Sequence, residues 1–407
     1  MGEIDCSGAK NAALPVIAAS ILSSEDIVLK NLPYLQDITT MFELIGSMGA
    51  DISLDENMNF RLNTSNLSNL EARYELVKTM RASILVLGSM IAKYGYAKIA
   101  LPGGCAIGTR PVNYHLKALE KLGAKISLKN GYIEAKAKKL IGAKIKFEGV
   151  TVTGTENLMM AASLADGISV LTNVAKEPEI TDLADFLNSM GARISGAGTD
   201  KIRIEGVKKL NGTNFTIPAD RIEAGTYLVA AAITHGNIKV NKIDPKRMGA
   251  IVETLQDAGA EVSLNTNSIS LNMSNKVLKP VNIVTAPFPG FPTDMQAQFT
   301  VLNCIGRGQS YVKETIFENR FMHVQELNRM GTDITIDGTV ALIKGVDSIS
   351  GAQVMATDLR ASASLILAGL IANGETIVDR IYHIDRGYER IEEKLSNLGA
   401  EILRLPN

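Results

Sequence analysis

The sequence predicts an α/β protein of two domains, assembled from six copies of one unit of about 70 residues. Two sequence patterns that alternate along the chain lead to this prediction. One is a surface helix that ends in glycine and precedes an alternating strand, and the other is an alanine-rich helix. The composition agrees, because 46% hydrophobic and 21% charged residues form an ordinary globular balance.

The first pattern is an amphipathic helix followed by glycine, a small residue and a strand. The segments KALEKLGAKISL and ETLQDAGAEVSL show it clearly. Glycine is expected there because a helix often ends on a left-handed residue, which only glycine adopts at little cost. The six glycines of the pattern are Gly49, Gly123, Gly191, Gly259, Gly331 and Gly399.

The second pattern is an alanine-rich helix, usually followed by glycine and a strand. EAGTYLVAAAITHGNIKV and RASASLILAGLIANGETIV are two of its six copies. These helices are apolar nearly all round, so we expect them to be buried. Each copy therefore reads as a strand, a buried helix, a strand, a surface helix and short final strands.

Six such copies exceed what one hydrophobic core usually holds, so we expect two domains of three copies each. The polar stretch KKLNGTNFTIPAD, Lys208–Asp220, is the predicted hinge between them. A linear solenoid is the competing architecture. Its end copies should be more polar than the others, and the first and sixth copies are not atypical in that way.

Charge and composition exclude several classes of function. A formal net charge of -1 argues against a general nucleic-acid binder. The apolar runs are short, and the first residues lack a basic start and an apolar stretch, so neither a membrane span nor a secretory leader is expected. Three scattered cysteines and four histidines without HExxH spacing predict no disulfide framework and no metal site. A cytoplasmic location is the expectation.

Basic residues recur close to the expected helix starts, where a cation opposes the helix dipole. Each could be a surface residue or an internal ion-pair partner, but an anion held at the helix ends would explain them together. The chain lacks GxxxxGK[ST] and a complete dinucleotide fingerprint, so ATP and NAD are not indicated. The basic residues are Lys10, Arg81, Arg110, Arg221, Arg320, Arg360 and Arg386.

The segment LPGGCAIGTRP, residues 101–111, has the composition of a loop. It carries Cys105, and Arg110 follows five residues later. A thiol on a glycine-rich loop near a guanidinium should ionise readily, which predicts a chemical role for Cys105. Cys6 and Cys304 stand in strand-like and apolar contexts, and we expect them to be buried and inert.

Two aspartates stand where buried helices should begin, Asp294 in FPTDMQAQF and Asp358 in ATDLRAS. From the local sequence alone, capping the helix amino end is the preferred interpretation of both. Asp294 becomes a candidate base because it occupies the repeat position that Lys10 and Arg360 hold elsewhere.

Seven segments along the chain resemble the signature segments of the UDP-N-acetylglucosamine 1-carboxyvinyltransferase family. They are SGAKNAALP, KTMRAS, LPGGCAIGTRPV, FPTDMQAQF, ETIFENRFMHVQEL, GAQVMATDLRAS and DRIYHIDRGYERIE. The resemblance implies a two-domain inside-out α/β barrel, with three βαβαββ copies per domain around buried helices. It implies a first domain of residues 10–218, a second of 1–9 and 219–407 with the N-terminal strand joining it, and an active site in the cleft between them.

The family reaction, as the resemblance implies it, moves the enolpyruvyl group of phosphoenolpyruvate to the 3-hydroxyl of UDP-N-acetylglucosamine. It runs through a tetrahedral intermediate, releases phosphate and begins the synthesis of peptidoglycan precursors. The resemblance implies no metal and no organic cofactor, and only these small molecules as partners. We also expect the hinge near residue 218 and the Cys105 loop to close when the UDP-sugar binds.

The resemblance assigns roles residue by residue. Lys10, Arg110 and Arg386 would hold the phosphate end of phosphoenolpyruvate, and Arg320 and Arg360 its carboxylate. Cys105 would be the general acid toward C3, could form an adduct with phosphoenolpyruvate and would be alkylated by fosfomycin. Asp294 would accept the proton of the sugar hydroxyl, beside Asn11. The further substrate-binding residues are Arg81, Pro111, Val112, Asn113, Tyr114, His115, Thr151, Val152, Thr153, Ile316 and Asp358.

Two other functions stay open at this point. The sister enzyme that uses shikimate 3-phosphate shares the fold and the donor, although KEPE and the cysteine loop favour the UDP-sugar enzyme. A non-catalytic anion-binding protein of the same repeat architecture is the rival from a different class.

Overall fold

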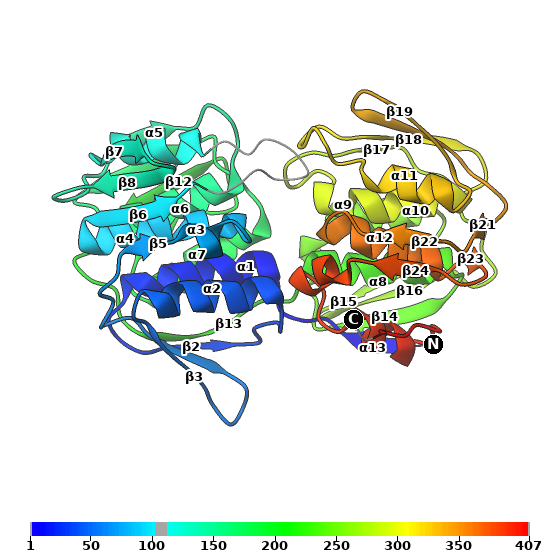
Figure 1. Ribbon diagram of the computed structural model, residues 1–407, viewed down its shortest axis with the longest axis horizontal. Coiled ribbons are helices and arrows are strands. Elements are labelled where there is room, and N and C mark those ends of the chain that lie inside the picture. Colours follow the sequence, from blue (N-terminus) through cyan, green and yellow to red (C-terminus); the bar gives the residue numbers. More distant parts are fainter. Residues whose placement is uncertain (1, 102–111, 406–407) are drawn as a thin grey trace. The chain divides into compact units, whose positions relative to one another are not determined.

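The computed structural model describes residues 2–101 and 112–405, which divide into two compact units (Figure 1). The N-terminal unit comprises residues 8–101 and 112–218, and the C-terminal unit comprises residues 2–7 and 219–405. The chain therefore passes between the units after residue 7 and again after residue 218. Each unit is a mixed α/β structure with several small sheets.

The N-terminal unit alternates helices with short strands. Its helices are α1 Lys10–Ala19, α2 Gln36–Ser47, α3 Tyr74–Val77, α4 Val86–Tyr94, α5 Asn113–Lys121, α6 Val152–Ser163 and α7 Pro178–Ser189, with 3-10 turns η1 Ser20–Leu22 and η2 Arg81–Leu85. Its strands are β2 Ile27–Lys30, β3 Asp51–Leu54, β4 Phe60–Asn63, β5 Glu71–Ala72, β6 Tyr96–Ala100, β7 Lys125–Lys129, β8 Tyr132–Lys136, β9 Lys144–Lys146, β10 Ile168–Thr172, β11 Arg193–Ser195, β12 Lys201–Glu205 and β13 Thr213–Thr216.

The C-terminal unit follows the same alternation. Its helices are α8 Arg221–Ile233, α9 Gly249–Asp257, α10 Gln296–Ile305, α11 His323–Arg329, α12 Leu359–Gly369 and α13 Ile391–Asn397, with 3-10 turns η3 Pro245–Arg247, η4 Thr293–Met295 and η5 Ile381–Arg386. Its strands are β1 Gly2–Asp5, β14 Asn237–Asn241, β15 Glu261–Asn265, β16 Ser268–Asn272, β17 Ile283–Val284, β18 Gln309–Lys313, β19 Asp333–Asp337, β20 Val340–Lys344, β21 Ile349–Ser350, β22 Gln353–Met355, β23 Ala372–Asn373 and β24 Ile377–Asp379.

The four-stranded sheets of the described chain share one topology. In the sheet β5-β6-β8-β7, β5 pairs in parallel with β6 across the intervening helices, with Glu71 opposite Lys98. The hairpin β7–β8 then adds two antiparallel strands. The sheets β9-β10-β12-β11 and β17-β18-β20-β19 repeat this arrangement. Each copy therefore runs strand, helix, strand, helix and hairpin, in the order that the sequence predicts.

Two copies take their first strand from a distant part of the chain. In the N-terminal unit, β13 pairs in parallel with β2, so Thr213 lies opposite Ile27. In the C-terminal unit, β1 pairs in parallel with β14, so Gly2 lies opposite Ile238, as the family resemblance implies for the N-terminal strand. A linear solenoid joins only neighbouring copies. The β13–β2 pairing joins the third copy to the first, and the solenoid alternative is therefore wrong.

The sixth copy departs from the others in its strands. Within the described residues it has two two-stranded parallel ribbons, β21–β23 and β22–β24. The strands break at Gly351, where an added Cβ would lie 2.2 Å from the carbonyl oxygen of Glu375. No strand forms in residues 401–405, so the expected final strands of this copy are absent there.

The six predicted glycines end the surface helices in the left-handed conformation, with φ between +90° and +108°. The hydrogen bonds repeat as well: Gly123 N donates to Glu120 O and Ala124 N to Leu119 O, and each copy has the equivalent pair. This is the Schellman ending, which satisfies carbonyls at the helix end. The prediction made from these glycines is confirmed.

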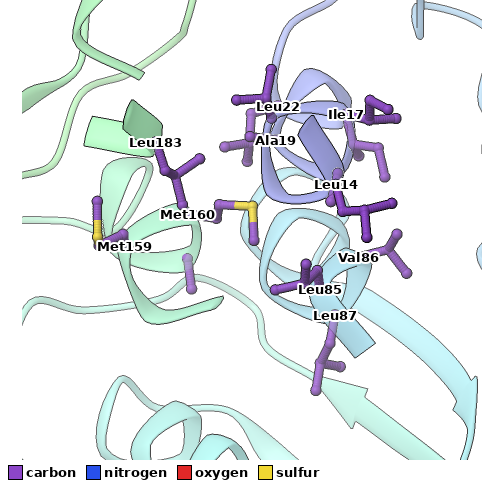
Figure 2. Close-up of a cluster of buried hydrophobic side chains, with 14 of the residues drawn as sticks. Leu14, Ile17, Ala19, Leu22, Leu85, Val86, Leu87, Met159, Met160 and Leu183 are labelled. Carbon is purple, nitrogen blue, oxygen red and sulfur yellow. The ribbon is translucent and has the colours of Figure 1, made fainter. Parts of the chain in front are cut away.

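The alanine-rich helices form the interior of each unit. In the N-terminal unit, side chains of α1, α4 and α6, among them Ile17, Val86 and Met160, meet in one cluster (Figure 2). In the C-terminal unit every residue of α8 is buried. The expected burial of these helices is confirmed. No helix of residues 2–101 or 112–405 has the length and apolar character needed to cross a membrane.

Candidate active site

Lys10 begins α1 and lies against the first turn of α2. Its Nζ is 3.2 Å from Oδ2 of Asp37, and the two side chains are only 10% and 7% exposed. No side chain caps the amino end of α1, whose N-cap residue is Ala9. The ammonium therefore stands at a helix end that can accept an anion, beside the carboxylate of Asp37. Asn11 follows on α1 and is half-buried.

His115 on α5 is held by an amide network inside the N-terminal unit. The backbone N–H of Gly88 donates to Oδ1 of Asn157 at 2.7 Å, which fixes the orientation of that amide. Nδ2 of Asn157 therefore donates to Ile84 O and to Nδ1 of His115, both at 2.9 Å. Since Nδ1 accepts, the neutral ring carries its proton on Nε2, which lies 3.3 Å from Thr153 Oγ1.

The charge state of His115 follows from its surroundings. Burial, and then the positive charge of Arg81, lower the pKa of His115 from 6.5 to about 4. The ring is therefore neutral at physiological pH and serves as a fixed polar group. Arg81 is the first residue of η2 and is half-buried. The structure thus brings together Arg81, His115 and Thr153, which the sequence predicts as substrate-binding residues from three different segments.

Thr151 and Val152 shape the start of α6. Thr151 is the N-cap residue, and its Oγ1 accepts a hydrogen bond from Gly154 N at 3.2 Å. Val152 is the first residue of the helix and is half-buried. The cap satisfies one free amide, a contribution of about 1 kcal/mol to helix stability. The remaining amides of this helix end can meet a ligand.

Val112, Asn113 and Tyr114 form the start of α5. Val112 is the N-cap residue, and its carbonyl accepts from His115 N at 3.0 Å. Asn113 is exposed and Tyr114 half-buried. Tyr114 and Phe147 line a surface groove of about 370 Å³. These residues therefore lie beside the His115 network but present their side chains nearer the surface.

Glu156 on α6 is a buried acid in the N-terminal unit, only 2% exposed. Burial, and then the neighbouring carboxylates Glu179 and Glu177, raise the pKa of Glu156 well above its ordinary value. Burial therefore favours the neutral form of this side chain. Glu156 is the fifth residue of α6, and the equivalent helix of the first copy, α1, begins with Lys10.

Asp294 joins two buried arginines in the C-terminal unit. Its Oδ1 accepts from Nη2 of Arg320 at 2.9 Å, and its Oδ2 accepts from Nη2 of Arg360 at 3.0 Å. Both arginine side chains are 3% exposed, whereas Asp294 is 26% exposed. Asp294 lies in η4, and no side chain caps that turn or α10. The helix-capping interpretation of Asp294 is therefore wrong, because two distant arginines hold its carboxylate.

The Arg360 guanidinium has further binding capacity. It lies 5.5 Å from the centre of the Tyr388 ring. Its Nε and Nη1 are buried and have no hydrogen-bond partner among the described residues. Burial alone would lower the pKa of Arg360, but Asp294 and further negative groups raise it, so the charge is retained. A buried guanidinium with unsatisfied N–H groups favours a second anion.

Glu314 organises the loops around Asp294. Its Oε1 accepts from Ile316 N at 2.8 Å and from Thr285 Oγ1 at 2.9 Å. Its Oε2 accepts from Thr293 Oγ1 at 2.8 Å. The carboxylate therefore ties the predicted contact residue Ile316 to the turn that carries Asp294.

Asp358 and Arg386 lie around the amino end of α12. Oδ1 of Asp358 accepts from Arg360 N at 2.8 Å and from Ala361 N at 3.1 Å, so its capping role is confirmed. Arg386 is the last residue of η5 and is half-buried. The next residue, Gly387, packs against Leu359, the first residue of α12. The Arg386 turn therefore lies beside the helix start that carries Arg360.

The cysteines divide as the sequence suggests. Cys6 and Cys304 are free and buried, and burial raises the pKa of both thiols, that of Cys304 to about 12. Both are therefore unreactive, as expected. Cys105, Arg110 and Pro111 lie outside the described residues. Among residues 2–101 and 112–405, no cluster of His, Cys, Asp and Glu could hold a metal ion.

Three residues of the site were missed by the sequence reasoning. Asp37 pairs with Lys10, Asn157 fixes His115, and Glu314 ties the Asp294 loops. Asn157 could have been found, because TGTEN repeats SGAKN and places Asn157 where Asn11 stands. Asp37 stands near a helix start and Glu314 follows a strand end, and the sequence around them shows no further sign of a role in the site.

The model of the family described as EPSP synthase (3-phosphoshikimate 1-carboxyvinyltransferase) matches residues 1–395. The crystal structure of the enolpyruvyl transferase NikO from Streptomyces tendae has a TM-score of 0.88 at 23% identity, covering 98% of this chain and 95% of that one. EPSP synthase from Acinetobacter baumannii has a TM-score of 0.76 at 19% identity, covering 100% and 97%. The likeness defines the fold class as that of the carboxyvinyl transferases.

Curated relatives narrow the family within this class. A Hydrogenovibrio crunogenus protein named UDP-N-acetylglucosamine 1-carboxyvinyltransferase is 58% identical over 403 residues, which are 99% of this chain and 96% of that protein. A Coxiella burnetii protein of the same name is 57% identical over 405 residues, 99% and 93% of the two chains. The chain belongs to the UDP-N-acetylglucosamine 1-carboxyvinyltransferase family, and the resemblance seen in its sequence segments is confirmed.

Proposed function

We propose that this protein transfers the enolpyruvyl group of phosphoenolpyruvate to the 3-hydroxyl of UDP-N-acetylglucosamine and releases phosphate. The observation that carries the proposal is the identity of 57–58% over nearly the whole chain to proteins named for this activity. In the reaction, C3 of the donor gains a proton while the sugar oxygen bonds to C2. The tetrahedral intermediate then loses a C3 proton and phosphate to give the enol ether.

The architecture that we propose is two inside-out α/β barrels, residues 10–218 and residues 1–9 with 219–407. The closed order of βαβαββ copies and the burial of α1, α4, α6 and α8 support it. In such a barrel the helix starts of three copies gather at one end, which suits the recurrence of charged residues there.

Arg320 and Arg360 are the proposed partners of the donor carboxylate. Both now hold Asp294, and Arg360 retains two N–H groups without a partner among the described residues. A carboxylate that binds the same guanidinium groups competes with Asp294 for their hydrogen bonds. The carboxylate of Asp294 is then free to accept a hydrogen bond from the sugar hydroxyl. We therefore assign Asp294 as the base for the sugar hydroxyl, active once the donor is bound.

The phosphate end of the donor is assigned to Lys10, Arg110 and Arg386. Lys10 stands at an uncapped helix end and Arg386 beside the start of α12. Fixed cations of this kind would also stabilise the phosphate-bearing intermediate. The proton for C3 is assigned to Cys105. Arg110 and Cys105 lie outside the described residues, and their roles stand on the family segments alone.

The acceptor is assigned to the remaining residues of the N-terminal unit and to Ile316. Arg81, the neutral His115 and Thr153 form a polar group in which Asn157 fixes the tautomer and orientation of the His115 ring. Tyr114 and the start of α6 lie near it in the same unit. Preorganised polar groups of this kind bind a neutral sugar and a nucleotide base with orientation as well as affinity.

Isotope incorporation tests the proposed mechanism. In deuterated water with both substrates, protonation at C3 and later loss of a C3 proton should place deuterium in the vinyl group of the product, as read by mass spectrometry. The mass of the product should rise only when the enzyme forms it by turnover in the deuterated water. Product formed without any deuterium would contradict addition followed by elimination and favour a direct displacement.

A further inference from the structure

Arg404 lies in the segment that follows α13, and its guanidinium binds two carboxylates of the same unit. Nη2 and Nη1 donate to Oδ1 and Oδ2 of Asp385 at 2.8 Å and 3.1 Å. Nε and Nη2 donate to Oε1 and Oε2 of Glu392 at 2.7 Å and 3.0 Å. Two-pronged, charge-assisted pairs of this kind fix orientation as well as distance.

Asp385 immediately precedes Arg386 in η5, so Arg404 acts on the turn that carries Arg386. On the other side, Tyr388 is buried and its hydroxyl lies 2.8 Å from Thr226 Oγ1. The core therefore fixes the backbone after Arg386, and Arg404 fixes the residue before it. Short 3-10 turns have poor internal hydrogen-bond geometry, so their position depends on such outside contacts.

A role in global stability explains these contacts less well. The Arg404 side chain is 34% exposed and that of Asp385 41%, so water screens this pair and limits its contribution to stability to the upper end of the range for surface pairs. Helix α13 is also held independently, because Lys394 binds Glu223 and lies 2.6 Å from Ser7 Oγ. Loss of Arg404 should therefore leave α13 docked and chiefly release the Asp385 turn.

We propose that Arg404 is a positioning residue of the reaction, which holds Asp385 and so fixes the turn from which Arg386 binds the phosphate end of phosphoenolpyruvate. The inference rests on the role given to Arg386 in the proposed function. Without Arg404 the turn gains freedom, and the donor and free phosphate must order it on binding. Binding of the UDP-sugar, assigned to other residues, should not change.

Steady-state kinetics of the full chain with the substitution Arg404→Gln test the proposal. We expect KM for phosphoenolpyruvate and the inhibition constant of inorganic phosphate to rise roughly ten-fold, less than the roughly hundred-fold cost of a misplacement of about 1 Å, because Arg386 itself is retained. KM for the UDP-sugar should stay within about two-fold of the parent value. Arg390→Gln is the matched control, since it removes an equally charged, exposed partner of Glu393 without touching Asp385.

Further variants keep the outcomes distinct. Asp385→Asn should raise the same two constants as Arg404→Gln, and the double variant should add little, because both act through one contact. Arg404→Lys keeps the positive charge but loses the two-pronged guanidinium geometry, so it should raise both constants by less than Arg404→Gln. It replaces Arg404→Gln in the test if the glutamine variant folds poorly. Unchanged donor constants in the Arg404 variants, beside raised ones in Arg386→Gln, would overturn this inference alone. Unchanged donor constants in Arg386→Gln would overturn the role of Arg386 and this inference with it.

Discussion

Acidification should destabilise the N-terminal unit through His115. The ring is neutral in the folded protein, with its pKa lowered from 6.5 to about 4 by burial and by Arg81. The unfolded chain therefore binds more protons than the folded one between these two values. The stabilising effect of the neutral ring is complete above the unfolded pKa and is lost as the pH falls toward the folded one.

The size of the effect follows from the shift. At about pH 5 an unfolded histidine is almost fully charged, whereas His115 in the folded protein is still neutral. The linked loss of unfolding free energy between about pH 7 and pH 5 is roughly 2 kcal/mol. His323 in the C-terminal unit is also buried with a lowered pKa, chiefly from burial, so the parent protein should lose more than this.

Urea unfolding at several pH values, followed by circular dichroism, isolates the contribution of His115. His115→Gln should be less stable at neutral pH, because Asn157 loses its acceptor, but its loss between about pH 7 and pH 5 should be roughly 2 kcal/mol smaller than in the parent. His235→Asn, at an exposed residue of the other unit, should follow the parent curve. A His115→Gln curve parallel to the parent curve would refute the reasoning.

Further predictions concern the same sites. Asp294→Asn should abolish turnover while calorimetry still detects binding of the UDP-sugar, and retained turnover would speak against Asp294 as the base. The same substitution should lower the unfolding free energy by about 2 kcal/mol, because two buried arginines lose part of their counter-charge. Glu156→Gln should remove the part of the decline in unfolding free energy that begins as the pH rises above the ordinary carboxyl pKa of 4.5, since a raised folded pKa lowers stability from there upward; a decline as steep as that of the parent would contradict a raised pKa of Glu156. Gly331→Ala should cost roughly 1–2 kcal/mol from its φ of +90° alone, since no atom lies within 4 Å of the added carbon; an unchanged melting temperature would contradict this. Fosfomycin with the UDP-sugar should add its mass once to the intact protein and not to Cys105→Ala; an unmodified parent would exclude the reactive thiol.

Local patterns predicted much of the fold. The six glycines, the buried alanine-rich helices and the Asp358 cap each depend on residues a few positions apart, so the sequence displays them directly. The pairings of β13 with β2 and of β1 with β14 join short strands over long stretches of chain. Four-residue strands carry too little pattern to select a distant partner.

The candidate site could likewise be predicted only where local sequence patterns reveal it. Helix-start cations indicated an anionic ligand, and family segments supplied the named roles. Asp294 was misjudged because a local rule favours capping, whereas Arg320 and Arg360, 26 and 66 residues away, hold its carboxylate. Glu314, Asn157 and Arg404 act on loops that only the tertiary structure brings within reach.

Phosphate release from phosphoenolpyruvate, measured with each acceptor, tests the central claim most directly. The account predicts stoichiometric release with UDP-N-acetylglucosamine and none above background with shikimate 3-phosphate. Release only with shikimate 3-phosphate would assign the chain to the sister reaction. Release with neither acceptor would favour a non-catalytic anion-binding protein and contradict the account as a whole.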